Sequence, residues 1–227
     1  MSDPSSALDP EGRLALEAVL ELLARERSSV SSVTEPPSAW KVHVEDSLCG
    51  LEVESLASAA RIADIGSGAG FPGIVLAVAL PTAEVELIES VGRKCEFMRR
   101  AIEAAGVGNA TVVNARSEEL AAGPDRERFD AVTARAVGRL STLAELASPL
   151  LREDGALVAW KGRRDEGEEL ELERAAGSLA MAPERILAVG PYAGSRHRHL
   201  HVMRKTGATP ADLPRRPGMA KKRPRGS

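Results

Sequence analysis

Three glycines at alternate positions, Gly66, Gly68 and Gly70, follow a short apolar run of β-forming residues and precede a proline. Glycine allows tight bends and lets a ligand approach the backbone closely. Asp64 lies two residues before the first glycine, and Glu89 ends the next β-type run. A strand end, a glycine loop and a helix N-terminus together bind nucleotides, and a carboxylate about twenty residues further on can accept hydrogen bonds from the ribose hydroxyls. This spacing predicts a nucleotide-binding site.

The spacing of the glycines discriminates between nucleotides. The dinucleotide fingerprint needs glycine at its first, third and sixth positions, but the sixth position here is Phe71, and no Lys-Ser or Lys-Thr pair of a phosphate loop follows. The pattern Asp-x-Gly-x-Gly-x-Gly with a downstream acid resembles the S-adenosylmethionine (SAM) loop of class I methyltransferases. That resemblance implies cofactor contacts from Asp64, Glu89, Phe71 and the three glycines. The alternative is a plain strand–turn–helix connection.

The elements that must position this loop alternate along the chain between β-type and helical patterns. Strands are expected at 61–65, 84–88, 110–114, 129–134, 155–160, 184–190 and 198–204, and helices at 72–80, 91–105, 139–151 and 166–181. Such alternation predicts an α/β fold with a mostly parallel sheet and helices on both faces. The resemblance adds a class I SAM-dependent, Rossmann-like methyltransferase fold, whose seven-stranded sheet ends in an antiparallel pair.

Three regions are expected. Residues 1–60 form an N-terminal helical cap and loop, in which Asp9 caps a helix that ends near Arg27. Residues 61–205 form the SAM-binding methyltransferase domain, and 206–227 form a basic, flexible tail. Residues 204–227 hold eight Lys or Arg and one Asp, whereas 1–203 hold 22 basic and 32 acidic residues. A basic tail on an acidic body suggests a polyanionic partner, the alternative being a disordered solubilising end.

Composition excludes several protein classes. Apolar residues make up 43% of the chain, but no run is long enough for a membrane span, and we expect no signal peptide. Cys49 and Cys95 have neither metal-type spacing nor a disulfide framework, so both are expected to be small buried hydrophobes. We therefore expect a cytoplasmic protein that holds no metal and does not bind membranes. A monomer is the simplest expectation, but the sequence leaves the oligomeric state open.

The segment Thr133–Ala136 ends the fourth predicted strand, beside the expected ligand crevice. Two methyltransferase signatures belong there, Asn/Asp-Pro-Pro-Tyr for exocyclic amines and Pro-Cys for pyrimidine C6, and neither is present. Guanine N7 needs neither device, since it offers a lone pair and carries no proton to remove. Positioning N7 in line with the sulfonium methyl would supply most of the catalysis.

A larger set of motifs shares one order and spacing over roughly residues 29–205. The pieces are His43-x-x-Asp46, Asp64–Gly73, Leu87–Ser90 with Lys94 and Phe97, Arg116–Glu119, Phe129–Ala136, Pro149–Leu151, Lys161–Gly162 and Arg198–Leu200. Together they resemble the small-subunit ribosomal RNA guanine-N7 methyltransferases, the RsmG family, formerly called glucose-inhibited division protein B. The resemblance implies methyl transfer from SAM to N7 of one guanine in 16S ribosomal RNA, presented naked or in the 30S particle.

The resemblance also implies roles for single residues. Ser117 and Glu118 would frame the adenine, and Arg135 would lie between cofactor and RNA as a positioning group, unless it forms a purely structural ion pair. RNA contacts are expected from these basic side chains: His43, Lys161, Arg198, Arg215, Arg216, Lys221 and Lys222. Deleting 206–227 should then weaken RNA binding and spare SAM binding.

The sequence departs from the family pattern in one segment, and two alternative functions stay open. Ser29, Val30 and Ser31 stand where the family has Asn-Leu-Thr, and serine reaches less far than asparagine. A small-molecule methyltransferase would need an apolar, aromatic-lined lid, which 3% aromatic residues do not favour. A ribosome-assembly factor that binds SAM and RNA without turnover stays open, because N7 transfer leaves no catalytic signature in the sequence.

Overall fold

The computed structural model describes residues 8–27 and 29–227. Residues 1–7 and 28, which belong to the predicted N-terminal cap and loop, lie outside the described residues. The strands are β1 (Arg61–Ile65), β2 (Glu84–Ile88), β3 (Ala110–Val113), β4 (Phe129–Arg135), β5 (Leu151–Lys161), β6 (Met181–Val189) and β7 (Arg198–Lys205). All seven predicted strands are present.

The seven strands form one sheet in the order β3-β2-β1-β4-β5-β7-β6. β1 pairs in parallel with both β2 and β4, whereas β7 runs antiparallel to its neighbours β5 and β6. The predicted antiparallel final pair is therefore confirmed. The chain moves outward from β1 in one direction and from β4 in the other, and ligands bind at the carboxyl edge beside such a switch point.

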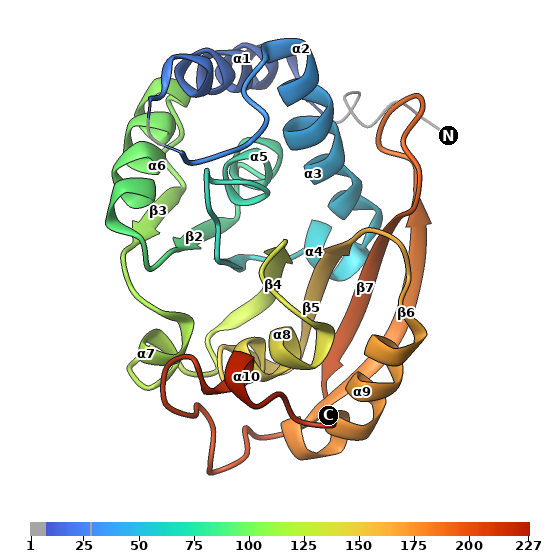
Figure 1. Cartoon of the computed structure of the whole chain (residues 1–227). Coiled ribbons are helices and arrows are strands. Elements are labelled where there is room, and N and C mark those ends of the chain that lie inside the picture. The colour runs from blue at the N-terminus through green and yellow to red at the C-terminus, as the bar shows by residue number, and fades with distance from the viewer. Residues whose placement is uncertain (1–7, 28) are drawn as a thin grey trace.

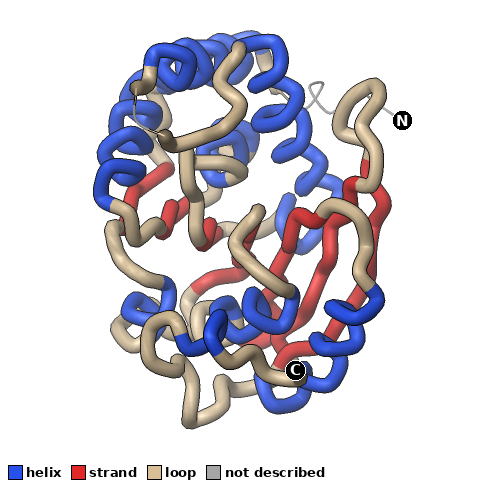
Figure 2. The backbone as a smooth tube through the Cα atoms, viewed as in Figure 1, coloured by secondary structure: helices blue, strands red, loops and turns tan. Residues whose placement is uncertain are grey.

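Helices cover both faces of the sheet (Figure 2). They are α1 (Pro10–Arg25), α2 (Pro36–Ala39), α3 (Asp46–Leu48), α4 (Glu54–Ala57), α5 (Gly73–Ala79), α6 (Gly92–Ala105), α7 (Ser117–Ala121), α8 (Leu140–Ala147), α9 (Glu166–Ala176) and α10 (Met219–Lys222). Short irregular helices, Trp40–Glu45 (π-helical), Cys49–Glu52 and Gly177–Leu179, extend them. No helix among the described residues is long and apolar enough to cross a membrane.

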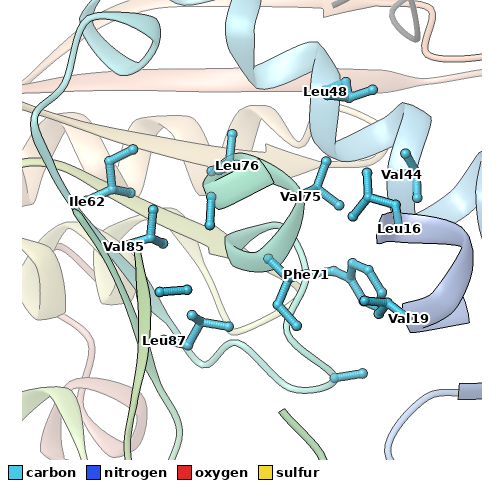
Figure 3. Packing of buried hydrophobic residues seen from close by; sticks show 14 of the residues in the cluster. Leu16, Val19, Val44, Leu48, Ile62, Phe71, Val75, Leu76, Val85 and Leu87 are labelled. Carbon is cyan, nitrogen blue, oxygen red and sulfur yellow. The ribbon is translucent and has the colours of Figure 1, made fainter. Parts of the chain in front are cut away.

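Two apolar clusters hold these layers together. The first joins α1, α5, α6 and residues 39–59 to one sheet face, where Leu16 and Val19 meet Phe71 and Val75 (Figure 3). α1 begins as predicted, since the Asp9 carboxylate accepts the Gly12 N–H at 2.7 Å. The second cluster joins α8, α9 and part of α7 to the opposite face. Successive side chains of the central strands point to opposite faces of the sheet, so each strand contributes residues to both clusters.

Residues 206–227, here called the C-terminal strap, run across α7 and α8 (Figure 1). Leu213 and Ala220 are buried, and Arg215 forms two hydrogen bonds of 2.5 Å with the carboxylate of Glu145. This packing differs from the flexible tail expected from composition. The composition of residues 206–227 shows an excess of basic residues. It cannot show that Glu145, in an earlier helix, is an acidic partner for Arg215.

Candidate active site

The glycine loop turns directly out of β1. The Gly66 N–H donates to the Ile88 carbonyl at 2.8 Å, which ties the loop to the end of β2. Gly66 has φ +66°, and a Cβ there would lie 2.7 Å from Val137 Cγ2, while Gly70 has φ +93° and would press on Ile74. Only glycine fits such a backbone without strain. The loop therefore passes close to the segment that follows β4.

Asp64 supports the loop from inside the sheet. Its side chain is fully buried and accepts the Gly73 N–H at 3.1 Å and the Thr133 hydroxyl at 2.9 Å. Burial raises the pKa of this carboxyl to about 6, against the lowering effect of its hydrogen-bond donors. The residue thus fixes the start of α5 relative to β4, and it does not line the neighbouring cavity.

Glu89 ends β2 with its carboxylate held by main-chain donors. Oε2 accepts the Gly68 N–H at 3.2 Å, and Oε1 accepts the Val91 N–H at 2.9 Å. Lys94 Nζ lies 3.9 Å from Oε2. Glu89 is almost completely buried, yet it borders the cavity beside the glycine loop.

A cavity of about 500 Å³ opens at this edge of the sheet. Its lining comes from the ends of β1 and β2, from α7, from α8 and from the C-terminal strap. The lining residues include Ile65, Gly66, Ile88, Glu89, Ser117, Glu118, Val137, Thr142, Leu146, Gly218, Ala220, Lys221 and Lys222. The cavity has the size and the mixed lining of a small-molecule site. A carboxylate for ribose hydroxyls, apolar walls for an adenine and exposed loop backbone fit a SAM molecule.

A second group of side chains gathers on the other side of the β4 terminus. The His43 ring stacks on Phe71, with the two ring centroids 4.5 Å apart and 7° between the planes. Arg135 donates from Nη1 to the Val42 carbonyl at 2.9 Å and to Asp46 Oδ2 at 3.1 Å. Its Nη2 lies 3.3 Å from His43 Nδ1. Arg135 therefore links the end of β4 to the helical segment of residues 40–48.

His43 is held in its neutral form. Its Nε2 lies 2.9 Å from the Val33 carbonyl, so this nitrogen carries the proton and Nδ1 accepts from Arg135. Burial lowers the pKa of His43 to about 4, with the Arg135 charge as the second cause. Ser31 Oγ lies 3.0 Å from Nε2. The segment that departs from the family pattern thus contacts this histidine directly.

A cavity of about 220 Å³ lies beside this group. Arg135, Asp46, Lys161 and Arg198 contribute its charged lining, and Trp160 contributes an aromatic ring. Lys161 Nζ pairs with a Glu168 oxygen at 2.6 Å. Among the residues that the structure describes, Arg198 Nε is the buried side-chain polar atom that has no hydrogen-bond partner, with Asp46 Oδ1 at 3.8 Å. This second cavity is therefore a charged pocket, lined by basic side chains and one carboxylate.

The two cavities meet at four consecutive residues. Val137 lines the larger cavity, whereas Arg135, Ala136 and Gly138 line the smaller one. Ala136 has φ +58°, in the left-handed region, so the chain turns sharply between the two. A group bound in one cavity therefore lies across a single backbone segment from a group bound in the other.

The structure divides the residues singled out from the sequence between three places. Gly66, Glu89, Ser117 and Glu118 line the larger cavity, while Asp64, Gly68, Gly70 and Phe71 shape the loop from outside it. Arg135, Lys161 and Arg198 line the smaller cavity, with His43 packed behind Arg135. In the strap, Arg215 is paired with Glu145, Arg216 is exposed, and Lys221 and Lys222 lie at the larger cavity.

Sequence reasoning missed the lining from α8 and the strap. Thr142, Leu146, Gly218 and Ala220 carry no motif of a nucleotide site, and they reach the cavity only through tertiary packing. Within the described ranges, no group of three or more His, Cys, Asp or Glu could hold a metal ion. Cys49 and Cys95 are free and buried, as expected.

Comparison with known proteins agrees with this geometry. A family model described as rRNA small subunit methyltransferase G matches residues 16–200. The ribosomal RNA small subunit methyltransferase G of Rubrobacter xylanophilus is 43% identical over 92% of this chain and 81% of its own length. That of Desulfitobacterium hafniense is 38% identical over 88% and 82%.

Solved structures show the same fold. A SAM-dependent O-methyltransferase from Thermotoga maritima superposes with a TM-score of 0.58 over 84% of this chain and 72% of its own, at 13% identity. The fold is that of class I SAM-dependent methyltransferases, and SAM is the cofactor. These findings confirm the resemblance drawn from the motifs: the chain belongs to the GidB family of rRNA small subunit methyltransferases G.

Proposed function

We propose that this enzyme transfers a methyl group from SAM to N7 of one guanine in 16S ribosomal RNA. Family membership supports SAM-dependent methylation of small-subunit ribosomal RNA. The observation that carries the proposal is the pair of cavities that meet at residues 135–138. One has the size and lining for SAM, and the other is a charged pocket one backbone segment away.

The larger cavity holds SAM through backbone and carboxylate groups. Glu89 binds the ribose hydroxyls, Ser117 and Glu118 frame the adenine, and Gly66 lets the backbone approach the ligand. When bound, SAM supplies a methyl group on a positively charged sulfur. Asp64, Gly68, Gly70 and Phe71 act indirectly, by fixing the shape of the loop.

The smaller cavity receives the target nucleotide. Arg135, Lys161 and Arg198 line this cavity and bring positive charge to it, which suits a phosphate or base oxygens. The Asp46 carboxylate faces the same cavity and can accept from the Watson–Crick edge of guanine, which presents N–H donors.

Arg135 acts as a positioning residue in this scheme. Guanine N7 offers a lone pair and carries no proton, so accepting a methyl group there would need no general base. Arg135 is fixed by the Val42 carbonyl and by Asp46, at the boundary between the cavities. Such a fixed group can hold the base in line with the methyl group.

Methyl transfer from labelled SAM to 16S ribosomal RNA, naked and as 30S particles, tests the proposal when the modified base is mapped. A single 7-methylguanine is the expected product. Tight SAM binding without transfer to either substrate would overturn the proposal in favour of a non-catalytic assembly factor. Transfer to another atom of the RNA would overturn the assignment to N7.

The setting of the enzyme follows from the same proposal. We place it in the cytoplasm, where ribosomal subunits are assembled, and we expect a monomer, because one chain supplies both cavities. Light scattering of the purified protein tests the second point, and a mass of twice the 24.0 kDa chain would contradict it.

A further inference from the structure

The C-terminal strap runs beside α7 and α8 (Figure 1), and four of its residues line the larger cavity. The cavity lining includes Gly218, Ala220, Lys221 and Lys222, together with residues from the ends of β1 and β2. The strap therefore contributes to the surface that meets the cofactor, although it lies far along the chain from the glycine loop.

Two polar contacts join the strap to the cavity wall. The Gly218 N–H donates to Glu118 Oε1 at 2.7 Å, and Ser117 Oγ donates to the other oxygen of the same carboxylate at 3.2 Å. The Thr142 hydroxyl lies 3.3 Å from the Ala220 carbonyl. Gly218 has φ +82°, which suits glycine and directs the chain into α10. The strap thus fixes the orientation of a carboxylate that faces the cavity.

Charged and apolar anchors secure the strap on either side of these contacts. Arg215 binds both oxygens of Glu145, a carboxylate that is only 3% exposed, and also donates to the Arg223 carbonyl at 2.8 Å. Leu213 is buried, and Arg126 donates to its carbonyl at 2.8 Å. Because this ion pair is shielded from solvent, removing one partner would leave an uncompensated buried charge, which is costly.

We propose that the C-terminal strap is a structural wall of the SAM site, which orients Glu118 and retains the cofactor. Because the strap and the cofactor share this surface, cofactor binding and strap docking stabilise each other by the same factor. This reverses the expectation that deleting 206–227 spares SAM binding. The proposal depends on SAM as the cofactor, and it does not depend on the RNA base that is methylated.

Calorimetric titration of SAM into full-length variants tests the proposal. Arg215→Ala removes the anchor to Glu145 and is expected to raise the dissociation constant of SAM about tenfold. Arg216→Ala is the matched control, since Arg216 is the next residue and its side chain is exposed. It is expected to leave SAM affinity unchanged. Equal SAM affinity in both variants would overturn the proposal.

A second variant separates strap docking from folding. Arg215→Ala leaves a buried carboxylate without its main partner, so Arg215→Ala combined with Glu145→Gln removes the ion pair without stranding a charge. A folded double variant with tenfold weaker SAM binding supports the proposal. A folded double variant with wild-type affinity contradicts it.

Trypsin digestion gives a readout independent of catalysis. Lys221 and Lys222 are exposed and lie at the cavity, whereas Arg196 is exposed in the loop before β7. Saturating SAM should slow cleavage after Lys221 and Lys222 about tenfold and leave cleavage after Arg196 unchanged. If the wild type binds SAM with no change in cleavage at the two lysines, the strap is not part of the site.

Discussion

The two cavities hold their carboxylates in different ways. In the SAM cavity, Glu89 and Glu118 accept hydrogen bonds from main-chain N–H groups, those of Gly68, Val91 and Gly218. In the smaller cavity the charged groups form close side-chain ion pairs, although Arg135 and Lys161 also donate to main-chain carbonyls. Asp46 pairs with Arg135, and Lys161 pairs with Glu168.

This difference relates to what each cavity binds. Main-chain donors keep their positions as salt and pH change, and they suit a ligand of constant shape. Side-chain ion pairs weaken with salt and can exchange one partner for another, such as a phosphate. The enzyme combines a fixed cofactor site with an adaptable RNA pocket, and the following experiments compare the two.

The largest expected effect follows Arg135→Lys. Lysine keeps the charge but cannot reach Val42, Asp46 and His43 at once, as the Arg135 guanidinium does. Turnover should fall about 100- to 1,000-fold, the range seen when a positioned donor is lost, while the SAM dissociation constant changes less than threefold. Arg152→Lys, at the opposite end of the sheet beside Asp130, is the control. A parallel loss of SAM affinity would show that the two cavities are not separate.

The free energy of unfolding, measured as a function of pH, should show the contribution of His43 to stability. Its pKa is about 4 in the fold against 6.5 unfolded, so the unfolded chain binds the extra proton as pH falls from 6.5 to 4. The stability it contributes is complete above pH 6.5, and the loss reaches about 3 kcal/mol at pH 4.

Asp64 titrates in the opposite sense, because its folded pKa of about 6 lies above the unfolded value of 3.8. The test is therefore the difference between wild type and His43→Asn in urea unfolding at each pH, in which the Asp64 contribution cancels. Parallel curves for the two proteins would show that His43 is not held neutral.

The affinities for RNA and for SAM should depend differently on salt concentration. If Arg135, Lys161 and Arg198 each release a counterion on binding single-stranded RNA, affinity should fall about 20-fold between 50 and 200 mM salt. SAM affinity should change less than twofold over the same range, because main-chain donors hold the carboxylates of its site. If salt weakened the binding of both ligands equally, the proposed difference between the two cavities would be wrong.

The smallest expected effect follows Glu89→Gln. The amide retains an oxygen for one main-chain donor but loses the charge and one acceptor, so SAM should bind about tenfold more weakly, or about 1.4 kcal/mol. RNA affinity in the absence of SAM should not change. Weaker RNA binding in this variant would indicate that Glu89 also shapes the second cavity.

The regular elements were predictable because their signals are local. Short runs of β-type residues between helical patterns located each strand, and Asp9 and Pro10 marked the start of α1. Some observed boundaries differ from the predicted ones, because an apolar pattern does not stop where an element stops. The helix expected at 139–151 ends at Ala147, and β5 begins at Leu151, four residues before the predicted start. α7 and α10 are only five and four residues long, too short for a helical period to show.

The site was predictable only in part, for a related reason. Spacing along the chain identified the glycine loop and Glu89, which are close in sequence and in space. It could not show that Asp64 faces Thr133 inside the sheet, or that Phe71 stacks on His43 instead of lining the cofactor cavity. Nor could it place Gly218 against Glu118, since that contact joins residues 100 positions apart.

The strap also has a consequence for synthesis of the protein. The cavity is lined by Gly66 and by the much later Lys222, so a nascent polypeptide cannot complete its cofactor site while the later segment is still inside the ribosomal exit tunnel. All seven strands precede the strap in the chain, so the sheet can assemble first, and on our proposal the methyl donor binds at full affinity once the strap docks. An enzyme that modifies ribosomal RNA thus completes its cofactor site only after Lys222 has left the exit tunnel.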